Sequence, residues 1–306
     1  MKFGIYVHSI RPKISLNEIL KVVQSAGIPY SNRNPDIAIV VGGDGTFGYY
    51  GKRLQIPMLF VGVNDKDIIG SKARLAEVLF EDLPKAIDDI NNGNYRLDKR
   101  RMFSVSIKHK NNDNQNYISG ATDILTDIYV ERGIFSRCIR YALSVTIHDA
   151  NSKYNILKKF TEYAIGNGII ISTSFGARGY YSYLDRITAG KGKKNNKANS
   201  NSIQFRSFPD HRLGICHIIP TFLVRKLSLG KRKENKKKRT LVPSSYIRYT
   251  IPFQSKIKLS LIRNADVRLY GTTEHSKGLA ITSNDEIMIR PSRRTAKIIR
   301  LDYGRT

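Results

Sequence analysis

Hydrophobic residues follow two different patterns along the chain. Up to about residue 95, short segments rich in apolar residues stand at 2–9, 37–41 and 58–63, and helical patterns follow the first and the third of them. The segment 2–9 predicts a first strand, and the continuous apolar runs 37–41 and 58–63 predict strands that are covered on both faces. The order strand, helix, strand, strand, helix is typical of a three-layer α/β domain with a mainly parallel sheet.

The predicted helices have recognisable ends. Ser15 and Glu18 have the spacing of a capping box, in which each side chain accepts a hydrogen bond from the other residue's backbone N–H. Gly27 stands where that helix is expected to end. Helical sequence is also predicted over about 73–90, with Pro84 placed to start a second helix within it. Residues 1–95 are therefore expected to form the α/β domain.

The pattern changes after Asn94, where apolar and polar residues alternate. Alternation with period two predicts strands that have one buried and one exposed face. Residues 96–287 are therefore expected to form an all-β domain that resembles a β-sandwich. The predicted strands cover 103–107, 124–130, 141–147, 168–172, 257–262, 267–270 and 286–289.

The formal net charge of +27 is concentrated in one part of the chain. Residues 191–240 hold fifteen Lys or Arg against two acidic residues. Such a charge attracts nucleic acid, membrane phosphates or small polyanions. We interpret the most basic stretches, 191–202 and 230–240, as solvated loops, and binding of nucleic acid stays open as a less favoured function.

Other features of the composition exclude several classes of protein. The start of the chain does not read as a signal peptide, and no apolar run approaches the roughly 18 residues needed to span a bilayer, so we expect a cytoplasmic protein without a membrane partner. Cys138 and Cys216 cannot form a disulfide framework, and we expect both to be reduced. His211, Cys216 and His217 lack a further paired ligand, so we predict no metal site there.

The motif with the clearest chemistry is Gly42-Gly43-Asp44-Gly45-Thr46, which follows directly after a predicted buried strand. Backbone N–H groups of a glycine-rich turn that leads into a helix can hold phosphate oxygens, at the end of the strand where α/β folds bind ligands. Asp44 is unfavourable beside phosphate unless it accepts a proton from an attacking hydroxyl or positions Mg²⁺. The motif matches neither GxxxxGK[ST] nor GxGxxG. The alternative is that the turn is only structural, with Asp44 as a helix cap.

With these residues the chain resembles the NAD kinases, as a divergent member of archaeal type. GGDGT is shared by NAD kinases, diacylglycerol-type lipid kinases and, with Ser for Thr, phosphofructokinases. Further stretches favour the NAD kinases: 61–64 resembles a GxN strand, 125–133 resembles LNEVVIHRG, and 166–180 resembles GDGLIVSTPTGSTAY. The residues that replace those typical of the family are Thr126, Asn167, Ser174, Phe175, Ala177, Arg178 and Gly179.

The resemblance implies roles for individual residues. Asp44 matches the group that engages the 2′-hydroxyl of the adenosine ribose and serves as its base, with Gly42, Gly43, Gly45 and Thr46 forming the phosphate turn. The matched NAD-binding positions are Thr126, Asp127, Arg137, Asn167, Arg178 and Tyr180. Of these, Asp127 matches the carboxylate that accepts ribose hydroxyls, and Arg178 stands where the family has Thr.

The resemblance also implies the reaction. This is transfer of a phosphoryl group from ATP or polyphosphate to the 2′-hydroxyl of NAD, which forms NADP, assisted by Mg²⁺ or another divalent cation. It further implies a homo-oligomer, a dimer or tetramer, and a chain end after about 288 that packs back on the first domain. The alternatives are another GGDGT kinase with a lipid, sugar or nucleotide acceptor, and a polyanion-binding protein with a vestigial kinase site.

Overall fold

The computed structural model describes most of the chain and divides it into two compact units. The first unit contains Met1–Arg101 and Arg294–Thr306, and the second contains Met102–Arg293. The described residues are 1–8, 12–63, 73–110, 116–134, 137–148, 157–184, 208–228, 239–240, 247–272 and 278–301. The predicted basic loop 191–202 and nearly all of 230–240 lie outside them.

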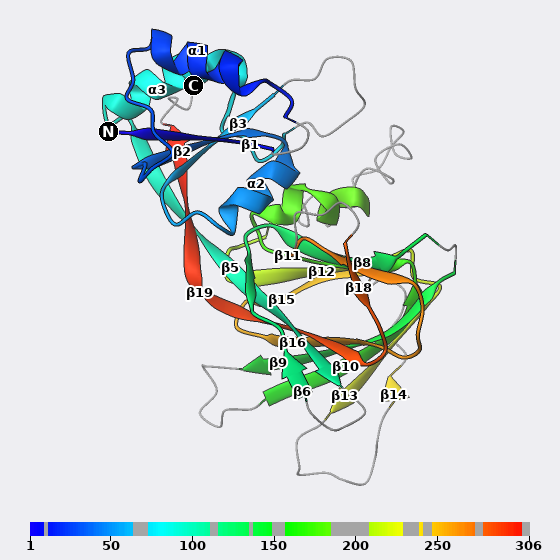
Figure 1. Cartoon of the computed structure of the whole chain (residues 1–306). Helices are drawn as coiled ribbons and strands as arrows, with labels where there is room; N and C mark the ends of the chain where they lie inside the picture. The colour runs from blue at the N-terminus through cyan, green and yellow to red at the C-terminus, as the bar shows by residue number, and fades with distance from the viewer. Residues whose placement is uncertain are drawn as a thin grey trace, which may run out of the picture. The chain divides into compact units, whose positions relative to one another are not determined.

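The first unit has three layers. Its parallel sheet has the order β1-β2-β3, β4 pairs with β3, and the end of β19 joins β3 in parallel at Ile298 and Met58. Figure 1 shows α1 and α3 on one side of this sheet and α2 on the other. The elements are β1 (Phe3–Val7), α1 (Leu16–Ser25), β2 (Ile37–Gly42), α2 (Asp44–Gly51), β3 (Met58–Gly62), β4 (Val78–Leu79), the 3-10 helix η1 (Phe80–Asp82) and α3 (Leu83–Asn91).

Local sequence explains these elements. The six residues of β2 are all buried, as the continuous apolar run predicted, because helices cover both faces of the sheet. Ser15 and Glu18 form the predicted capping box at the start of α1. One core of buried apolar residues joins strands and helices, and it includes Ile299 and Leu301 from the end of β19. The three-layer α/β fold is confirmed.

The helix predicted over 73–90 is wrong in its first half. Ala73 has a φ of 41°, and Val78 pairs with Val61 as part of a parallel strand. The backbone N–H of Glu77 donates to Phe60 O at 2.8 Å. Hydrogen bonds to the edge of β3 therefore outweigh the local helix propensity, and the helix begins only at Leu83, with Pro84 in its first turn.

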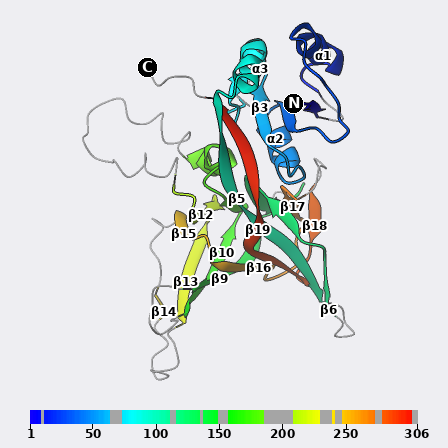
Figure 2. The same cartoon turned by 90° about the vertical axis from the view of Figure 1, so that its left-hand side faces the viewer.

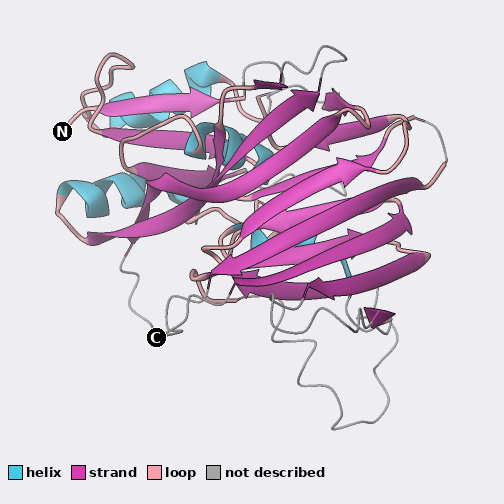
Figure 3. Ribbon diagram, turned by 90° about the horizontal axis from the view of Figure 1, so that it is seen from below, coloured by secondary structure: helices cyan, strands magenta, loops and turns pink. Residues whose placement is uncertain are grey.

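The second unit is built almost entirely of strands, as Figure 3 shows. Strands β5 (Tyr95–Lys110) and β19 (Asp285–Leu301) are long and belong in part to each unit. The remaining elements are β6 (Asn116–Ile118), β7 (Thr122–Ile124), β8 (Asp127–Arg132), β9 (Ile139–His148), β10 (Leu157–Gly166), β11 (Gly168–Ser172), η2 (Gly176–Arg178), η3 (Tyr180–Ser182), β12 (Arg212–Ile218), β13 (Phe222–Ser228), β14 (Arg239–Thr240), β15 (Arg248–Pro252), β16 (Lys256–Leu261), β17 (Val267–Tyr270) and β18 (Leu279–Ile281).

Two antiparallel sheets form this unit. One has the order β19-β16-β9-β10-β13-β14, seen side by side in Figure 2, and the other has the order β15-β12-β11-β8-β17-β18. A single apolar core takes inward residues from both, such as Leu143 and Leu259 from the first and Ile171 and Leu269 from the second. The β-rich, sandwich-like character predicted for this part of the chain is confirmed.

Candidate active site

The GGDGT turn joins the end of β2 to the start of α2. Gly42 ends the strand, Gly43 is the N-cap of the helix, and Asp44 is the first helical residue. Gly42 has a φ of +154°, and a Cβ on it would lie 2.8 Å from Thr46 Oγ1. Only glycine fits at this position without strain, so the turn itself requires Gly42.

Asp44 and Gly45 face a different environment. Asp44 is half-buried, and its Oδ1 accepts a hydrogen bond from the backbone N–H of Leu75 at 3.0 Å. It does not cap α2, because Gly43 holds that position. Gly45 is exposed, and a Cβ on it would meet nothing within 4 Å. Packing of the described residues therefore gives no reason for glycine at position 45.

The turn brings together groups that suit a phosphorylated ligand. The first N–H groups of a helix have no partner within the helix and carry its positive dipole end. Here they lie at the carboxyl end of a parallel strand, beside the Asp44 carboxylate. The arrangement can hold phosphate oxygens and, next to them, a group that accepts a proton.

In the second unit, strand pairing places Thr126 and Asp127 beside the loop after β11. Asp127 is opposite Ser172 in the register of β8 and β11. Thr173 is buried, and its Oγ1 donates to Leu125 O at 2.6 Å while its backbone N–H donates to Thr126 O at 2.8 Å. The 172–180 loop is therefore fixed on the backbone just before β8.

Gly176 shows how closely the loop approaches. A Cβ on Gly176 would lie 2.5 Å from the carbonyl oxygen of Thr126, and a Cβ on Gly179 would lie 3.7 Å from Asp127 Oδ2. Asp127 Oδ2 therefore lies close to the backbone of Gly179. Arg178, between these two glycines, is exposed. The structure thus brings Thr126, Asp127 and Arg178 into one region.

Tyr180 belongs to the same region. The Tyr180 ring packs against Tyr129 at a centroid distance of 5.1 Å, and the Tyr180 hydroxyl donates to Glu131 Oε1. Tyr129 in turn stacks on Tyr270 at a centroid distance of 4.8 Å. Burial raises the pKa of Tyr180, and the acceptor Glu131 raises it further, so the phenol keeps its proton. Burial and the charges of Asp127 and Glu131 raise the pKa of Tyr129 to about 12.

The sequence reasoning missed Glu131 and Tyr129. Both share the face of β8 that carries Asp127, because residues two apart in a strand point the same way. Burial raises the pKa of Glu131, although the hydrogen bond from Tyr180 and the charge of Arg132 oppose the rise. The period-two pattern from Asp127 onward contained this signal.

Asn167 and Arg137 are placed differently. Asn167 lies just before β11, where its backbone N–H donates to Ile218 O at 2.9 Å and its backbone oxygen accepts from Arg132 N at 3.0 Å. It is thus close in the sheet to Glu131, which pairs with Gly168. Arg137 is exposed, in the connection that leads to β9, and the hydrogen bonds described above do not include it.

The described part of the chain contains no group of three or more His, Cys, Asp or Glu side chains that could hold a metal ion. His217, for which the sequence predicted no metal role, is fully buried and hydrogen-bonded to Glu162 and Tyr141. Among the described helices, none is long and apolar enough to cross a membrane.

The fold defined above is that of the NAD kinases. An NAD kinase from Archaeoglobus fulgidus in complex with ATP superimposes with a TM-score of 0.57, over 99% of this chain and 94% of that chain, at 14% identity. A yeast NADH kinase complexed with NADH gives a TM-score of 0.59, over 98% of this chain and 83% of that chain, also at 14% identity. At this identity the likeness establishes the fold alone.

The sequence itself is similar to NAD kinases over about half its length. The NAD kinase of Clostridium kluyveri is 34% identical over 148 residues, which are 47% of this chain and 44% of the relative. The chain therefore spans less than half the length of that relative. No family model matches the sequence. The resemblance to NAD kinases that the motifs indicated is confirmed, and the archaeal subtype stays a prediction.

Proposed function

We propose that the protein transfers a phosphoryl group from ATP to the 2′-hydroxyl of NAD and so forms NADP. The observation that carries this proposal is the intact GGDGT turn at the carboxyl end of β2, in a chain that has the NAD kinase fold. Asp44 is the general base of the reaction. Its carboxylate takes the proton of the 2′-hydroxyl as that oxygen attacks the γ-phosphorus of ATP and ADP leaves.

Phosphate binding falls to the backbone in this proposal. The N–H groups at the start of α2 hold phosphate oxygens, and the open space at Gly45 allows close approach. Mg²⁺ prefers one or two carboxylates together with substrate phosphates and water to a dedicated protein cage. We therefore propose that Mg²⁺ or another divalent cation arrives with the phosphates of ATP or polyphosphate, and that Asp44 is its candidate protein contact.

NAD recognition falls to the second unit. The Asp127 carboxylate accepts hydrogen bonds from ribose hydroxyls. The single hydroxyl of Thr126 can form fewer hydrogen bonds than a side-chain amide could. Asn167 can both donate to and accept from a carboxamide. Arg178 and Arg137 supply cations for phosphate, and the partly exposed ring of Tyr180 packs against the dinucleotide. The homo-oligomer, a dimer or tetramer, is likewise a proposal.

A direct assay tests the function. The purified chain is incubated with ATP or polyphosphate and Mg²⁺, and with NAD, NADH or a panel of lipid, sugar and nucleotide acceptors. Formation of NADP in preference to the other products is the expected result. Phosphorylation of a different acceptor would favour another GGDGT kinase, and no transfer to any acceptor would favour the polyanion-binding alternative.

Gly45→Ala separates folding from ligand binding. The added methyl group meets no atom of the described protein and raises helix propensity, so stability should stay the same or rise by about 0.5–1 kcal/mol. If a phosphate approaches this backbone, kcat/KM should nevertheless fall by about tenfold to a hundredfold. Gly120→Ala is the matched control, since Gly120 also faces open space. Full activity of Gly45→Ala would remove this turn from the phosphate site.

Arg178→Thr restores the residue that the NAD kinases carry. The exposed guanidinium should favour the dinucleotide phosphates, so the KM for NAD should rise by about two- to fivefold, the size of an exposed ion pair. The rise should shrink in high salt. Arg140→Thr, at another exposed arginine, is the control. Equal KM values for the Arg178→Thr and Arg140→Thr proteins at low salt would exclude Arg178 from the site.

A further inference from the structure

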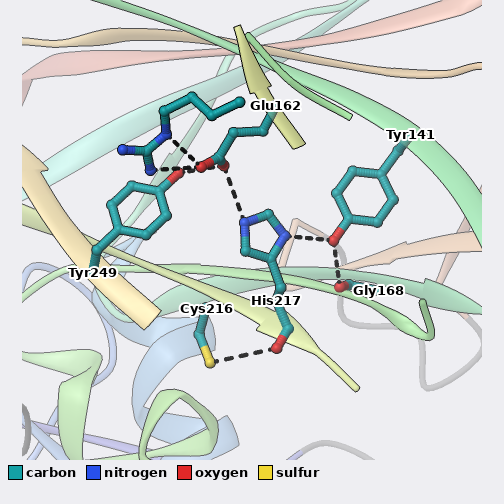
Figure 4. Close-up of polar contacts among 7 residues, drawn as sticks. Tyr141, Glu162, Gly168, Cys216, His217 and Tyr249 are labelled. Atoms are coloured by element: carbon teal, nitrogen blue, oxygen red, sulfur yellow. Dashed lines mark hydrogen bonds and ion pairs between the residues drawn. The ribbon is translucent and has the colours of Figure 1, made fainter. Parts of the chain in front are cut away.

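A buried polar cluster joins the two sheets of the second unit. We call the side chains of Tyr141, Glu162, His217, Arg225 and Tyr249 the core polar cluster (Figure 4). Tyr141, Glu162 and Arg225 come from β9, β10 and β13 of one sheet, and His217 and Tyr249 come from β12 and β15 of the other. Glu162 and His217 are 0% exposed, in a part of a sandwich core where apolar side chains are the rule.

Glu162 acts only as an acceptor in this cluster. Its Oε1 accepts from Arg225 Nε at 2.9 Å and from Nη2 at 2.6 Å, and its Oε2 accepts from Tyr249 Oη at 2.5 Å. Burial raises the pKa of Glu162, but hydrogen bonds from His217 and Tyr249 and the charges of His217 and Arg225 hold it below its usual value. The group is thus a carboxylate, and His217 Nε2, at 3.0 Å from Oε2, must carry a proton.

Tyr141 decides the state of the other ring nitrogen. Burial raises the pKa of Tyr141 well above its usual value, so it keeps one hydroxyl proton. Its Oη lies 2.9 Å from Gly168 O and 2.7 Å from His217 Nδ1. A carbonyl oxygen can only accept, so the contact with Gly168 is a hydrogen bond only when the Tyr141 proton points to it. The contact with His217 is then also a hydrogen bond only if Nδ1 carries a proton.

The alternative state has a structural consequence. If His217 is neutral, Nδ1 can only accept, and the Tyr141 proton must turn away from Gly168 to satisfy it. The carbonyl of Gly168 then loses this hydrogen bond. If His217 is an imidazolium, its positive charge is attracted by Glu162 on β10 and repelled by the guanidinium of Arg225 on β13. Arg225 is partly exposed to solvent.

Gly168 is the neighbour of Asn167, which we have proposed as an NAD-binding residue. The backbone N–H of Asn167 donates to Ile218 O, one residue beyond His217. The backbone oxygen of His217 also accepts from Tyr183 Oη at 3.0 Å, and the ring of Tyr183 lies 5.9 Å from that of Tyr180. His217 therefore lies next to Ile218, which holds the backbone N–H of Asn167, and its own backbone oxygen binds Tyr183, whose ring packs near Tyr180.

We propose that His217 is a positioning residue: as a buried imidazolium between Glu162 and Tyr141, it directs the Tyr141 proton to Gly168 and so fixes Asn167 for the dinucleotide. The part that concerns NAD rests on the proposed function. The protonation of His217 follows from its contacts with Glu162 and Tyr141 and does not depend on the proposed function. Removal of the Tyr141 hydroxyl takes away the hydrogen bond to Gly168, so the KM for NAD should rise while kcat changes little.

The first measurement does not depend on activity. Imidazole nitrogen shifts of the full chain, labelled with ¹⁵N-histidine, are recorded at pH 7, and His217 is identified by its loss in His217→Gln. Both ring nitrogens should be protonated at neutral pH. A neutral ring with an unprotonated Nδ1 at pH 7 would overturn the proposal, whatever the enzyme assay shows.

The second measurement compares KM and kcat for NAD between the wild type and its variants at pH 7. Tyr141→Phe should raise KM about tenfold, the size of one ordinary hydrogen bond, with kcat nearly unchanged. Tyr163→Phe, a residue further along β10 on the opposite face from Glu162, is the matched control and should behave as wild type.

Three outcomes are distinguishable. Wild-type KM in Tyr141→Phe, or a fall in kcat alone that follows loss of folded protein, contradicts positioning of Asn167. If Tyr141→Phe does not fold, His217→Gln decides, because a wild-type KM in that variant also contradicts it. If the wild type does not phosphorylate NAD at all, the proposed function fails and the positioning of Asn167 for NAD falls with it, while the spectra still decide the state of His217.

Discussion

Asp44→Asn should lower phosphoryl transfer by about 10²- to 10⁴-fold, the usual contribution of a general base. An amide has nearly the shape of the carboxylate, and its oxygen can still accept the hydrogen bond from the backbone N–H of Leu75. It cannot take the proton of the attacking hydroxyl. The melting temperature should therefore stay the same while kcat collapses.

The comparison needs a second carboxylate in the same unit. Asp88→Asn, on the exposed face of α3, makes the same chemical change away from the turn and should leave both activity and melting temperature unaltered. We would measure initial rates with NAD, ATP and Mg²⁺ for the three proteins. Turnover within a few-fold of wild type in a well-folded Asp44→Asn protein would show that Asp44 is not the base.

Glu162→Gln should produce the largest loss of stability. Glu162 is fully buried and accepts hydrogen bonds from Arg225, Tyr249 and His217. Neutralising it leaves the largely buried guanidinium of Arg225 without its counter-ion, which typically costs about 3–5 kcal/mol. Unfolding by urea, followed by tyrosine fluorescence and far-UV circular dichroism, measures the effect. Glu286→Gln breaks an ion pair with the exposed Lys258 and should cost less than about 1 kcal/mol.

The stabilisation by Glu162 should also depend on pH. Because the folded chain holds the pKa of Glu162 below its ordinary value of 4.5, the ionised carboxylate stabilises the fold above about pH 4.5. This contribution is lost as the pH falls through the lowered pKa. The difference in stability between wild type and Glu162→Gln should therefore shrink in acid. A difference of the same size at pH 3 and pH 7 would contradict the assignment of Glu162 as an ionised group.

Local sequence predicted the features that depend on neighbours along the chain. The capping box at Ser15 and Glu18 formed because its two hydrogen bonds lie within one helical turn. The buried strand 37–41 formed because a continuous apolar run needs cover on both faces. The helix predicted over 73–90 was wrong up to Asp82, because the edge of β3 offered hydrogen bonds to 77–79 that no local pattern shows.

Some features of the candidate site could likewise be predicted from consecutive residues, whereas others depend on how the strands pair. The GGDGT turn was recognisable because its glycines and Asp44 are consecutive, and the structure adds that Gly42 is required by the backbone whereas Gly45 faces open space. The contact of Tyr180 with Glu131 joins residues 49 positions apart. The alternation in β8 places Asp127, Tyr129 and Glu131 on one face, but sheet register decides what lies opposite them.

The sequence by itself determined the two classes of fold, the phosphate turn and its carboxylate, and the likeness to NAD kinases, because each of these rests on periodicity or on consecutive residues. Only the tertiary structure decided the core polar cluster. Glu162 interrupts an inward apolar row, and as a sequence feature it gives no partner. Its partners His217, Arg225 and Tyr249 are 55, 63 and 87 residues further along the chain. Two features bring these residues together: the pairing of β10 with β9 and β13, and the packing of this sheet on β12 and β15. Only the tertiary structure supplies the donors, and without them a buried carboxylate would not be stable.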